Sequence, residues 1–322
     1  MRALPTHSRD ESGQVIVFVL LIFVVMVGMA ALVIDVGSWY HAQRKLQTAV
    51  DAAALAGAQE LPTSPSTAST VAKQYAQNNY AGMPVPTVTF PDPGTIDVQA
   101  QAATPGIFVP VFERILHSST VHNVVTVHAH AQAQVSVPLF MKNVAPVAVK
   151  NTVACAVTNP SCYGQTLTLS FDESQVSSST IGLINLTCHS TASTACGSSS
   201  GIGGSQLKDW IESGYQDALP ANQWYGVKTG ETVGPVKQGF MDRVGVPLFF
   251  PVFDQVANSG SSYFFHVIGW AAFVIDANGV DWGSHTRQLT GHFTTFIATD
   301  LASGGTVGGA TDFGVHVITL TK

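Results

Sequence analysis

Three histidines alternate with other residues in a charge-free stretch, and imidazoles at this spacing are able to bind a metal. In "VHAHAQAQV" His128 and His130 share one strand face, and His122 lies further along the same face. Two histidines at i and i+2 can reach one zinc or iron ion, which then needs a third ligand and an oriented second layer of groups. No carboxylate lies between Ile115 and Met141. We therefore expect a half-exposed strand face that tolerates imidazoles, with no metal and no other cofactor.

A serine-rich segment formally satisfies the nucleophile-elbow pattern G-x-S-x-G. It runs from Gly197 to Gly201, but "STAC" precedes it and "IGG" follows it. A nucleophile elbow needs an apolar strand before the serine and a helix after it. The chain also lacks H-E-x-x-H, a P-loop and a dinucleotide fingerprint. These patterns predict a flexible serine loop and no catalytic residues.

The four cysteines fall close together and are even in number, which favours disulfides in an oxidising compartment. Six residues that include Asn159-Pro160 separate Cys155 from Cys162, and seven small or polar residues separate Cys188 from Cys196. Both loops can close locally, so we favour these two pairs. Pairing of Cys155 with a distal cysteine and a zinc site are the alternatives.

The charge balance argues against a nucleic-acid partner. Only 11% of the residues are charged, the formal net charge is -6, and Asn151 to Leu207 contains no lysine or arginine. Phosphate binding needs clustered cations. We expect contacts through apolar and neutral polar surface.

An apolar run near the start of the chain is long enough to cross a bilayer. Val15 to Ile34 contains twenty residues without charge or proline. As a helix it spans ~30 Å, the hydrocarbon thickness of a membrane, whereas a signal peptide has a shorter apolar core of about 7–15 residues. We therefore predict a retained transmembrane span; a signal peptide or a buried core helix are the alternatives.

The orientation of this span is not decided by charge, because two basic residues stand on each side of it. The long chain that follows carries all four cysteines. We therefore expect the N-terminus in the cytoplasm and the C-terminal body outside it, in a single-pass protein of the cell membrane.

The residues after the span predict a continuation of the same helix. Its alanine-rich part places Leu46, Ala49, Val50, Ala53 and Gly57 on one face. The small residues allow close approach of another backbone, either from the same chain or from a neighbouring subunit.

Two acidic residues on this helix have different surroundings. Asp35 is the first charge after the span, and Asp51 lies sixteen positions later. We expect Asp35 at the membrane interface, or paired with a basic residue of a neighbouring subunit, and Asp51 on the helix surface.

The segment "GQVIVFVLLIFVVMVGMAALVIDVGSWYHAQRKLQTAVDAAALAGAQEL" resembles the N-terminus of TadE/TadG-like proteins of the Flp (tight adherence) pilus-assembly system. In that family an apolar span ends in a V-D-x-G step, followed by an aromatic residue and an "R-x-LQ-x-A-x-DAAALAGA" helix. The matching positions are Asp35, Gly37, Tyr40, Arg44, Leu46, Gln47, Ala49, Asp51, Ala52, Ala53, Ala54, Leu55, Ala56, Gly57 and Ala58. The resemblance implies an envelope-anchored component of a pilus or secretion apparatus, with other subunits of that apparatus as partners.

Two further family patterns are incomplete in this chain. Gly13-Gln14 is similar to a prepilin cleavage position, but Phe18 stands where prepilins usually carry glutamate, so processing after Gly13 stays open. Larger TadG-like proteins carry a magnesium-binding D-x-S-x-S turn. Asp172 and Ser174 match its first positions, whereas Val176 replaces the second serine. The missing hydroxyl argues against a metal site.

Alternation and turn residues predict an α+β protein in three parts. Residues 1–61 hold a cytoplasmic head, the span and the alanine-rich helix. Residues 62–145 form a small pilin-like α+β unit, with a helix over 71–79, a hairpin over 85–102, a short helix over 109–117 and a strand over 120–137. Residues 151–322 form a β-rich domain with helices beginning near Ser205 and Pro235, and with Asn278-Gly279 as a tight turn between two strands.

These patterns together favour a membrane-anchored, non-catalytic structural or assembly component of a Tad-like pilus or related secretion apparatus, in contact with the lipid bilayer. The alternative is a membrane-tethered adhesin whose β-rich domain binds through an exposed patch of aromatic residues: Trp224, Tyr225, Trp270 and Trp282. A metal hydrolase has only the histidine strand in its favour.

Overall fold

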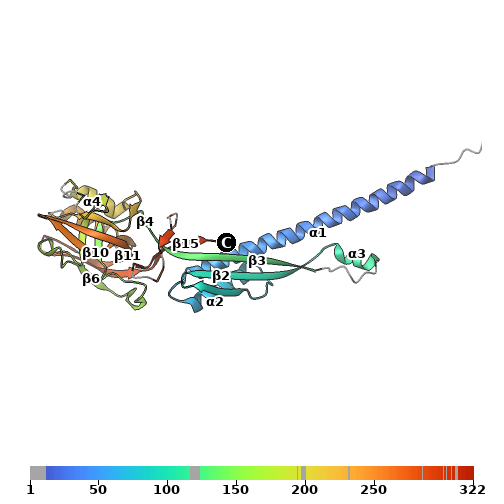
Figure 1. Ribbon diagram of the computed structural model, residues 1–322, viewed down its shortest axis with the longest axis horizontal. Helices are drawn as coiled ribbons and strands as arrows, with labels where there is room; N and C mark the ends of the chain where they lie inside the picture. Colours follow the sequence, from blue (N-terminus) through green and yellow to red (C-terminus); the bar gives the residue numbers. More distant parts are fainter. Residues whose placement is uncertain are drawn as a thin grey trace, which may run out of the picture. The chain divides into compact units, whose positions relative to one another are not determined.

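The computed structural model describes residues 12–116, 124–193, 195–196, 201–230, 233–284, 286–299, 301, 303–305, 307–308 and 311–322. Helices and sheets are mixed, one long apolar helix stands at the N-terminus, and the C-terminal region is rich in strands (Figure 1). The α+β prediction is therefore confirmed. The chain divides into two compact units, one formed by Met1–Ala53, Lys73–Thr87 and Val98–Ala131, and the other by the remaining residues.

Helix α1 (Ser12–Ala58) continues through Gly37 without interruption. Nearly all side chains from Val15 to Ile34 are exposed, whereas Leu46 is fully buried. Within the described part of the chain, α1 is the one helix long and apolar enough to cross a membrane. An apolar half without covering protein is what a bilayer-spanning helix requires, because lipid solvates its side chains.

The first sheet gathers strands that are distant in the sequence. Its order is β1 (Thr87–Asp92), β2 (Thr95–Pro105), β3 (Val124–Pro138), β15 (Val315–Leu320) and β13 (Phe296–Ile297), with β14 (Ser303–Gly305) also on β3. Strand β15 runs antiparallel to β3, so the end of the chain returns to the sheet of the first half. Helix α2 (Pro65–Asn79) precedes β1 in the chain, and helix α3 (Val109–Leu116) lies between β2 and β3 (Figure 1). The three-part division therefore stays a prediction.

The second sheet closes on itself around an aromatic core. Its order is β10 (Leu248–Ser259), β5 (Val147–Lys150), β7 (Ile181–Ser190), β9 (Gln223–Val227), β11 (Ser262–Trp282), β12 (Arg287–Thr294) and β6 (Leu167–Ser170). Strand β10 pairs with both β5 and β11, which closes five strands into a ring. Phe253 and Phe265 stack at 3.9 Å inside it.

Short elements complete this part of the chain. They are β4 (Phe140–Met141), β8 (Leu219–Pro220), the 3-10 turns η1 (Pro160–Cys162) and η2 (Glu173–Gln175), and the helices α4 (Gly204–Ser213) and α5 (Val233–Met241).

The predicted tight turn at Asn278-Gly279 is wrong, because β11 passes through both residues. Ile275 pairs with Gly291 and Val280 with Leu289, so the residues between them form a bulge in one strand. Asn278 has a φ of 66°, and a Cβ on Gly279 would lie 2.0 Å from the carbonyl oxygen of Thr290. The conformational freedom of Asn-Gly serves a bulge as well as a hairpin turn.

Two helix starts also differ from the sequence prediction. Helix α2 begins at Pro65, earlier than the predicted residue 71, because proline is compatible with the first helical turn. Helix α4 begins at Gly204 with Gly203 as its N-cap, so Ser205 lies inside the helix and does not cap it.

Candidate functional site

Asp35 connects the end of the apolar half of α1 to the start of α3. Its Oδ1 accepts hydrogen bonds from the backbone N–H groups of Ile107 (2.6 Å) and Phe108 (3.0 Å), and its Oδ2 accepts one from Val109 (3.0 Å). The first N–H groups of a helix have no partner within the helix. The Asp35 carboxylate therefore caps α3 from a position 72 residues away.

The burial of Asp35 argues against the alternative expectation, a pair with a basic residue of a neighbouring subunit. Only 3% of the residue is exposed, so it has no free face for a basic residue of a neighbouring subunit. A carboxylate at a helix N-terminus is favoured by the partial positive charge of the unpaired N–H groups. Asp35 is thus an internal cap within its own chain.

Gln47 joins α1 to β3 through a pair of backbone contacts. Its Nε2 donates to the carbonyl oxygen of His130 (2.8 Å) and to Oδ1 of Asp51 (2.7 Å), and its Oε1 accepts from the N–H of His130 (3.4 Å). Asp51 therefore orients Gln47 from the half-buried surface of α1.

The small residues of α1 pack within this chain. Leu46, Ala49, Val50 and Ala53 are at most 1% exposed in the single chain. A Cβ on Gly57 would lie 2.5 Å from Cδ1 of Ile96 and 2.9 Å from the carbonyl oxygen of Ala68. Of the two interpretations of this face, packing against the same chain is the one that these contacts support.

The other motif positions are less constrained. Ala54 and Ala56 are buried, Ala52 and Leu55 are half-buried, and a Cβ on Gly37 would meet no atom within 4 Å. Arg44 is exposed and donates from Nε to the hydroxyl of Tyr40 (3.1 Å).

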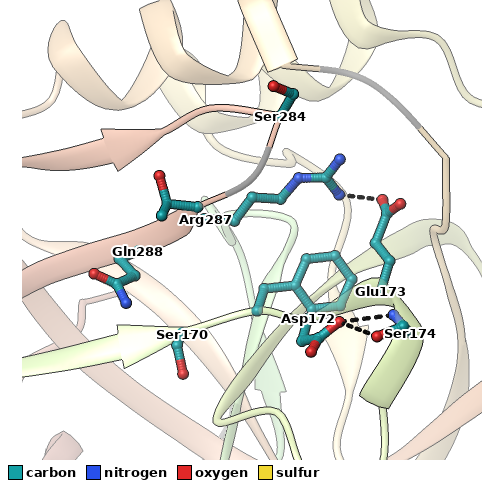
Figure 2. A pocket seen from close by; sticks show the side chains of 9 residues that line it. Ser170, Asp172, Glu173, Ser174, Ser284, Arg287 and Gln288 are labelled. Atoms are coloured by element: carbon teal, nitrogen blue, oxygen red, sulfur yellow. Dashed lines mark hydrogen bonds and ion pairs between the residues drawn. The ribbon is translucent and has the colours of Figure 1, made fainter.

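A polar cavity of about 510 Å³ lies beside strands β6 and β12 (Figure 2). Arg287 pairs there with Glu173, which also accepts a hydrogen bond from the N–H of Gly230 (3.1 Å). The Arg287 guanidinium is 5.9 Å from the ring centroid of Phe171. The cation is thus neutralised by a carboxylate and packed on an aromatic face.

The predicted incomplete metal turn lies at the edge of this cavity. Oδ1 of Asp172 accepts hydrogen bonds from the N–H (2.8 Å) and the hydroxyl (2.6 Å) of Ser174, and these bonds lower the pKa of the carboxyl group (Figure 2). Val176, at the position of the missing serine, is 1% exposed in the core. The residues D-x-S therefore form a local cap of η2.

Two of the three histidines of the predicted strand face lie on β3 within the described residues. His128 is exposed and His130 half-buried, while His122 lies outside the described residues. In the described part of the chain, no group of three or more His, Cys, Asp or Glu is placed to hold a metal ion. Most of the serine loop, residues 197–200, also lies outside the described residues.

The aromatic patch expected for an adhesin is wrong. Tyr225, Trp270 and Trp282 are at most 1% exposed, and only Trp224 is half-buried. Tyr225, Trp270 and Trp282 belong to the hydrophobic core, where Trp282 packs against Phe240 of α5 with the ring centroids 5.0 Å apart. Their sequence positions alone do not reveal this burial.

The structure contains two disulfides, Cys155–Cys162 and Cys188–Cys196. These are the local pairs that short loops favour. Each joins cysteines within the strand-rich part of the chain.

An uncovered apolar helix that continues into a packed, alanine-rich stem defines a chain suited to a single-pass membrane anchor with a folded α+β body. Residues 13–60 match the family described as putative Flp pilus-assembly TadE/G-like. This match confirms the resemblance of the N-terminal segment and supports a role related to Flp pilus assembly. No curated protein and no solved structure gives a significant match to the chain.

The sequence did not reveal the partners of two acidic residues in these sites, Asp35 and Glu173. The cap on α3 joins Asp35 to Ile107, and the ion pair joins Glu173 to Arg287, each across a large sequence separation. One signal was available for the cap: a carboxylate directly after an apolar span needs a polar partner.

Proposed function

We propose that this protein is a membrane-anchored structural or assembly component of a Tad-like pilus or related secretion apparatus, without a catalytic role. The observation that carries the proposal is the coincidence of the family match over residues 13–60 with α1. The apolar half of α1 is exposed and suited to lipid. The half that carries the family motif, from Asp35 to Ala58, packs against other parts of the same chain.

The motif residues support a structural role because of what they contact. Asp35 caps α3, Gln47 binds the backbone of β3, and Gly57 permits close packing near Ala68. Each contact fixes the folded body to the helix that enters the membrane. The predicted partners are the bilayer and other subunits of the apparatus, with no nucleic acid.

Crosslinking in the intact cell envelope tests the proposed partners. A tagged full-length chain should recover other pilus or secretion components after crosslinking and solubilisation. As a control, the same tag on an unrelated single-span membrane protein measures non-specific recovery. Recovery of the same proteins with both tagged proteins, or of no apparatus component at all, would contradict the proposal.

The orientation has its own test. We propose that the residues before Val15 are cytoplasmic and that the body lies outside, where disulfides form. A reporter that is active only outside the cytoplasm should work when it is fused after Lys322. Activity of a cytoplasm-only reporter at the same position, or four free thiols in the isolated protein, would reverse this assignment.

The domain boundaries near residues 61 and 145–151 remain part of the proposal. Limited proteolysis of the full chain should cut first near them if three parts fold separately. Resistance of both boundaries, with cleavage elsewhere, would show that the parts fold together.

A further inference from the structure

The start of α3 presents apolar side chains to the outside of the protein. Ile107 is 58% exposed and Val111 is 51% exposed, while Phe108 is half-buried. Isolated exposed apolar residues are common in soluble proteins. These residues differ in their location, because they adjoin Asp35, which directly follows the apolar stretch that ends at Ile34.

Protein also covers one face of the last turn of the apolar stretch. Ala31 is 5% exposed, although its neighbours Leu32 and Val33 are 65% and 68% exposed. Ala31 and Asp35 are four positions apart and share a helix face. Ala31 lies ~6 Å closer to the N-terminus along the helix axis. One face of α1 is therefore covered by protein one turn before Asp35, inside the predicted span.

The hydrogen bonds described on this face come from the first residues of the α3 segment. Ile107, Phe108 and Val109 all donate to Asp35, and a Cβ on Gly106 would lie 3.4 Å from its Oδ2. Figure 1 shows α3 beyond the ends of β2 and β3, on the side toward the N-terminal half of α1.

We propose that residues 107–116 form a second membrane contact, which lies in the interface of the leaflet where the α1 span ends. The occupant of this apolar surface is lipid, because residues 107–109 bind Asp35, which directly follows the apolar span. This inference rests on the proposed membrane anchor. It goes beyond a single-pass span by assigning a separate interfacial element.

The chemistry of Asp35 fits such a position. Backbone N–H groups that lie against the hydrocarbon region need internal acceptors, because no water is available to them there. The carboxylate supplies three of the first N–H groups of this segment with a partner. Arg114, exposed in the last turn of α3, can extend its guanidinium to anionic headgroups. Asp35 is therefore a positioning residue for the interfacial element.

Site-specific fluorescence in nanodiscs tests this contact on the full chain. All four cysteines are in disulfides, so an introduced cysteine is the only free thiol. Val111→Cys carries an environment-sensitive nitrobenzoxadiazole dye in discs of phosphatidylcholine and phosphatidylglycerol. Tyr75→Cys in α2 is the matched control, because Tyr75 is 49% exposed, close to the 51% of Val111. Leu32→Cys reports on the span itself.

We expect a nitroxide near the lipid headgroup to quench the dye at Val111 at least about twofold more than the dye at Tyr75, because interfacial helices lie ~5–10 Å into the headgroup boundary. A nitroxide at the end of the acyl chain should quench it less. Adding Asp35→Asn should reduce the quenching at Val111 and leave that at Leu32 unchanged.

Each of the other outcomes contradicts one part of the proposal. Quenching at Leu32 with equal, weak quenching at Val111 and Tyr75 would overturn the interfacial contact and keep the anchor. A shielded dye at Val111 that lipid nitroxides do not quench would assign the surface to a second copy or another protein. Absence of quenching at Leu32 would overturn the anchor, and the interfacial contact with it.

Discussion

The Oδ1 atom of Asp35 lies 2.6 Å from the backbone nitrogen of Ile107, and this partly buried contact joins α1, at the end of its apolar half, to the start of α3. Three backbone N–H groups share one carboxylate there. The family motif position Asp35 thus has a structural task inside a single chain.

Replacement of Asp35 by alanine should release the start of α3. Loss of a helix-capping acceptor costs about 0.5–2 kcal/mol, and buried donors left without a partner add to this. Hydrogen exchange of residues 107–111 should accelerate in detergent-solubilised protein. Glu60→Ala, a change of another acidic residue near the end of α1, is the control. Unchanged exchange at 107–111 in Asp35→Ala would contradict the capping role.

Replacement of Gly57 by alanine should destabilise the body. The new Cβ would lie 2.5 Å from Ile96 Cδ1, 2.9 Å from the carbonyl oxygen of Ala68 and 3.0 Å from Ala72 Cβ. Overpacking of this kind costs about 1–3 kcal/mol, and a thermal melt of the full chain should show a lower midpoint.

Gly37→Ala is the matched control in the same helix, because its Cβ would meet no atom within 4 Å. Alanine is favoured over glycine in a helix interior by about 1 kcal/mol, so this variant should melt no lower than the parent. Equal destabilisation by both changes would contradict close packing at Gly57 as the cause, because a Cβ on Gly37 meets no atom within 4 Å.

Replacement of Glu173 by glutamine should destabilise the strand-rich part of the chain, because Arg287 would keep a buried charge without a counter-ion. Arg287 is 8% exposed and Glu173 is 28% exposed. Loss of one partner from a fully buried pair costs roughly 3–5 kcal/mol, so about 1–3 kcal/mol is expected for this partly exposed one. Urea unfolding measures the change.

Glu212→Gln is the corresponding control. Glu212 is exposed to a similar degree (30%), but its partner Lys208 is 35% exposed. Exposed pairs contribute about 0–1 kcal/mol. If both substitutions lower the free energy of unfolding equally, burial of Arg287 is not the cause.

Stability should fall at alkaline pH because of two tyrosines, the buried Tyr225 and the half-buried Tyr163. Burial raises the pKa of Tyr225, with a smaller contribution from Tyr215, and burial followed by the charge of Asp312 raises the pKa of Tyr163. Both values lie above the value of ~10 for an unfolded chain. Their contribution is therefore complete below that pH and is lost as the pH rises toward the folded pKa.

Urea unfolding at about pH 8 and about pH 11, on either side of the unfolded tyrosine pKa, measures this loss. Tyr225→Phe removes the ionisable hydroxyl together with its hydrogen bond to the carbonyl oxygen of Pro220 (2.8 Å). The stability of this variant should therefore depend less on pH. A dependence that stays the same in this variant would exclude Tyr225 as a source.

The sequence by itself determined the local features whose physical cause lies within a few residues. Twenty apolar residues require a lipid or core environment, and the small residues before Gly57 permit a closely packed stem. The short cysteine loops favoured the pairs that the structure contains, Cys155–Cys162 and Cys188–Cys196. Alternation also predicted most strands of the second half.

Only the tertiary structure decided which distant residues meet. The partner of Asp35 is a helix start 72 positions later, and β15 pairs with β3 across most of the chain. Neither contact leaves a periodic signal, because chain closure over such a distance depends on the whole set of packed elements. The same reason explains Asn278-Gly279, where neighbouring strand β12 selects a bulge over a turn.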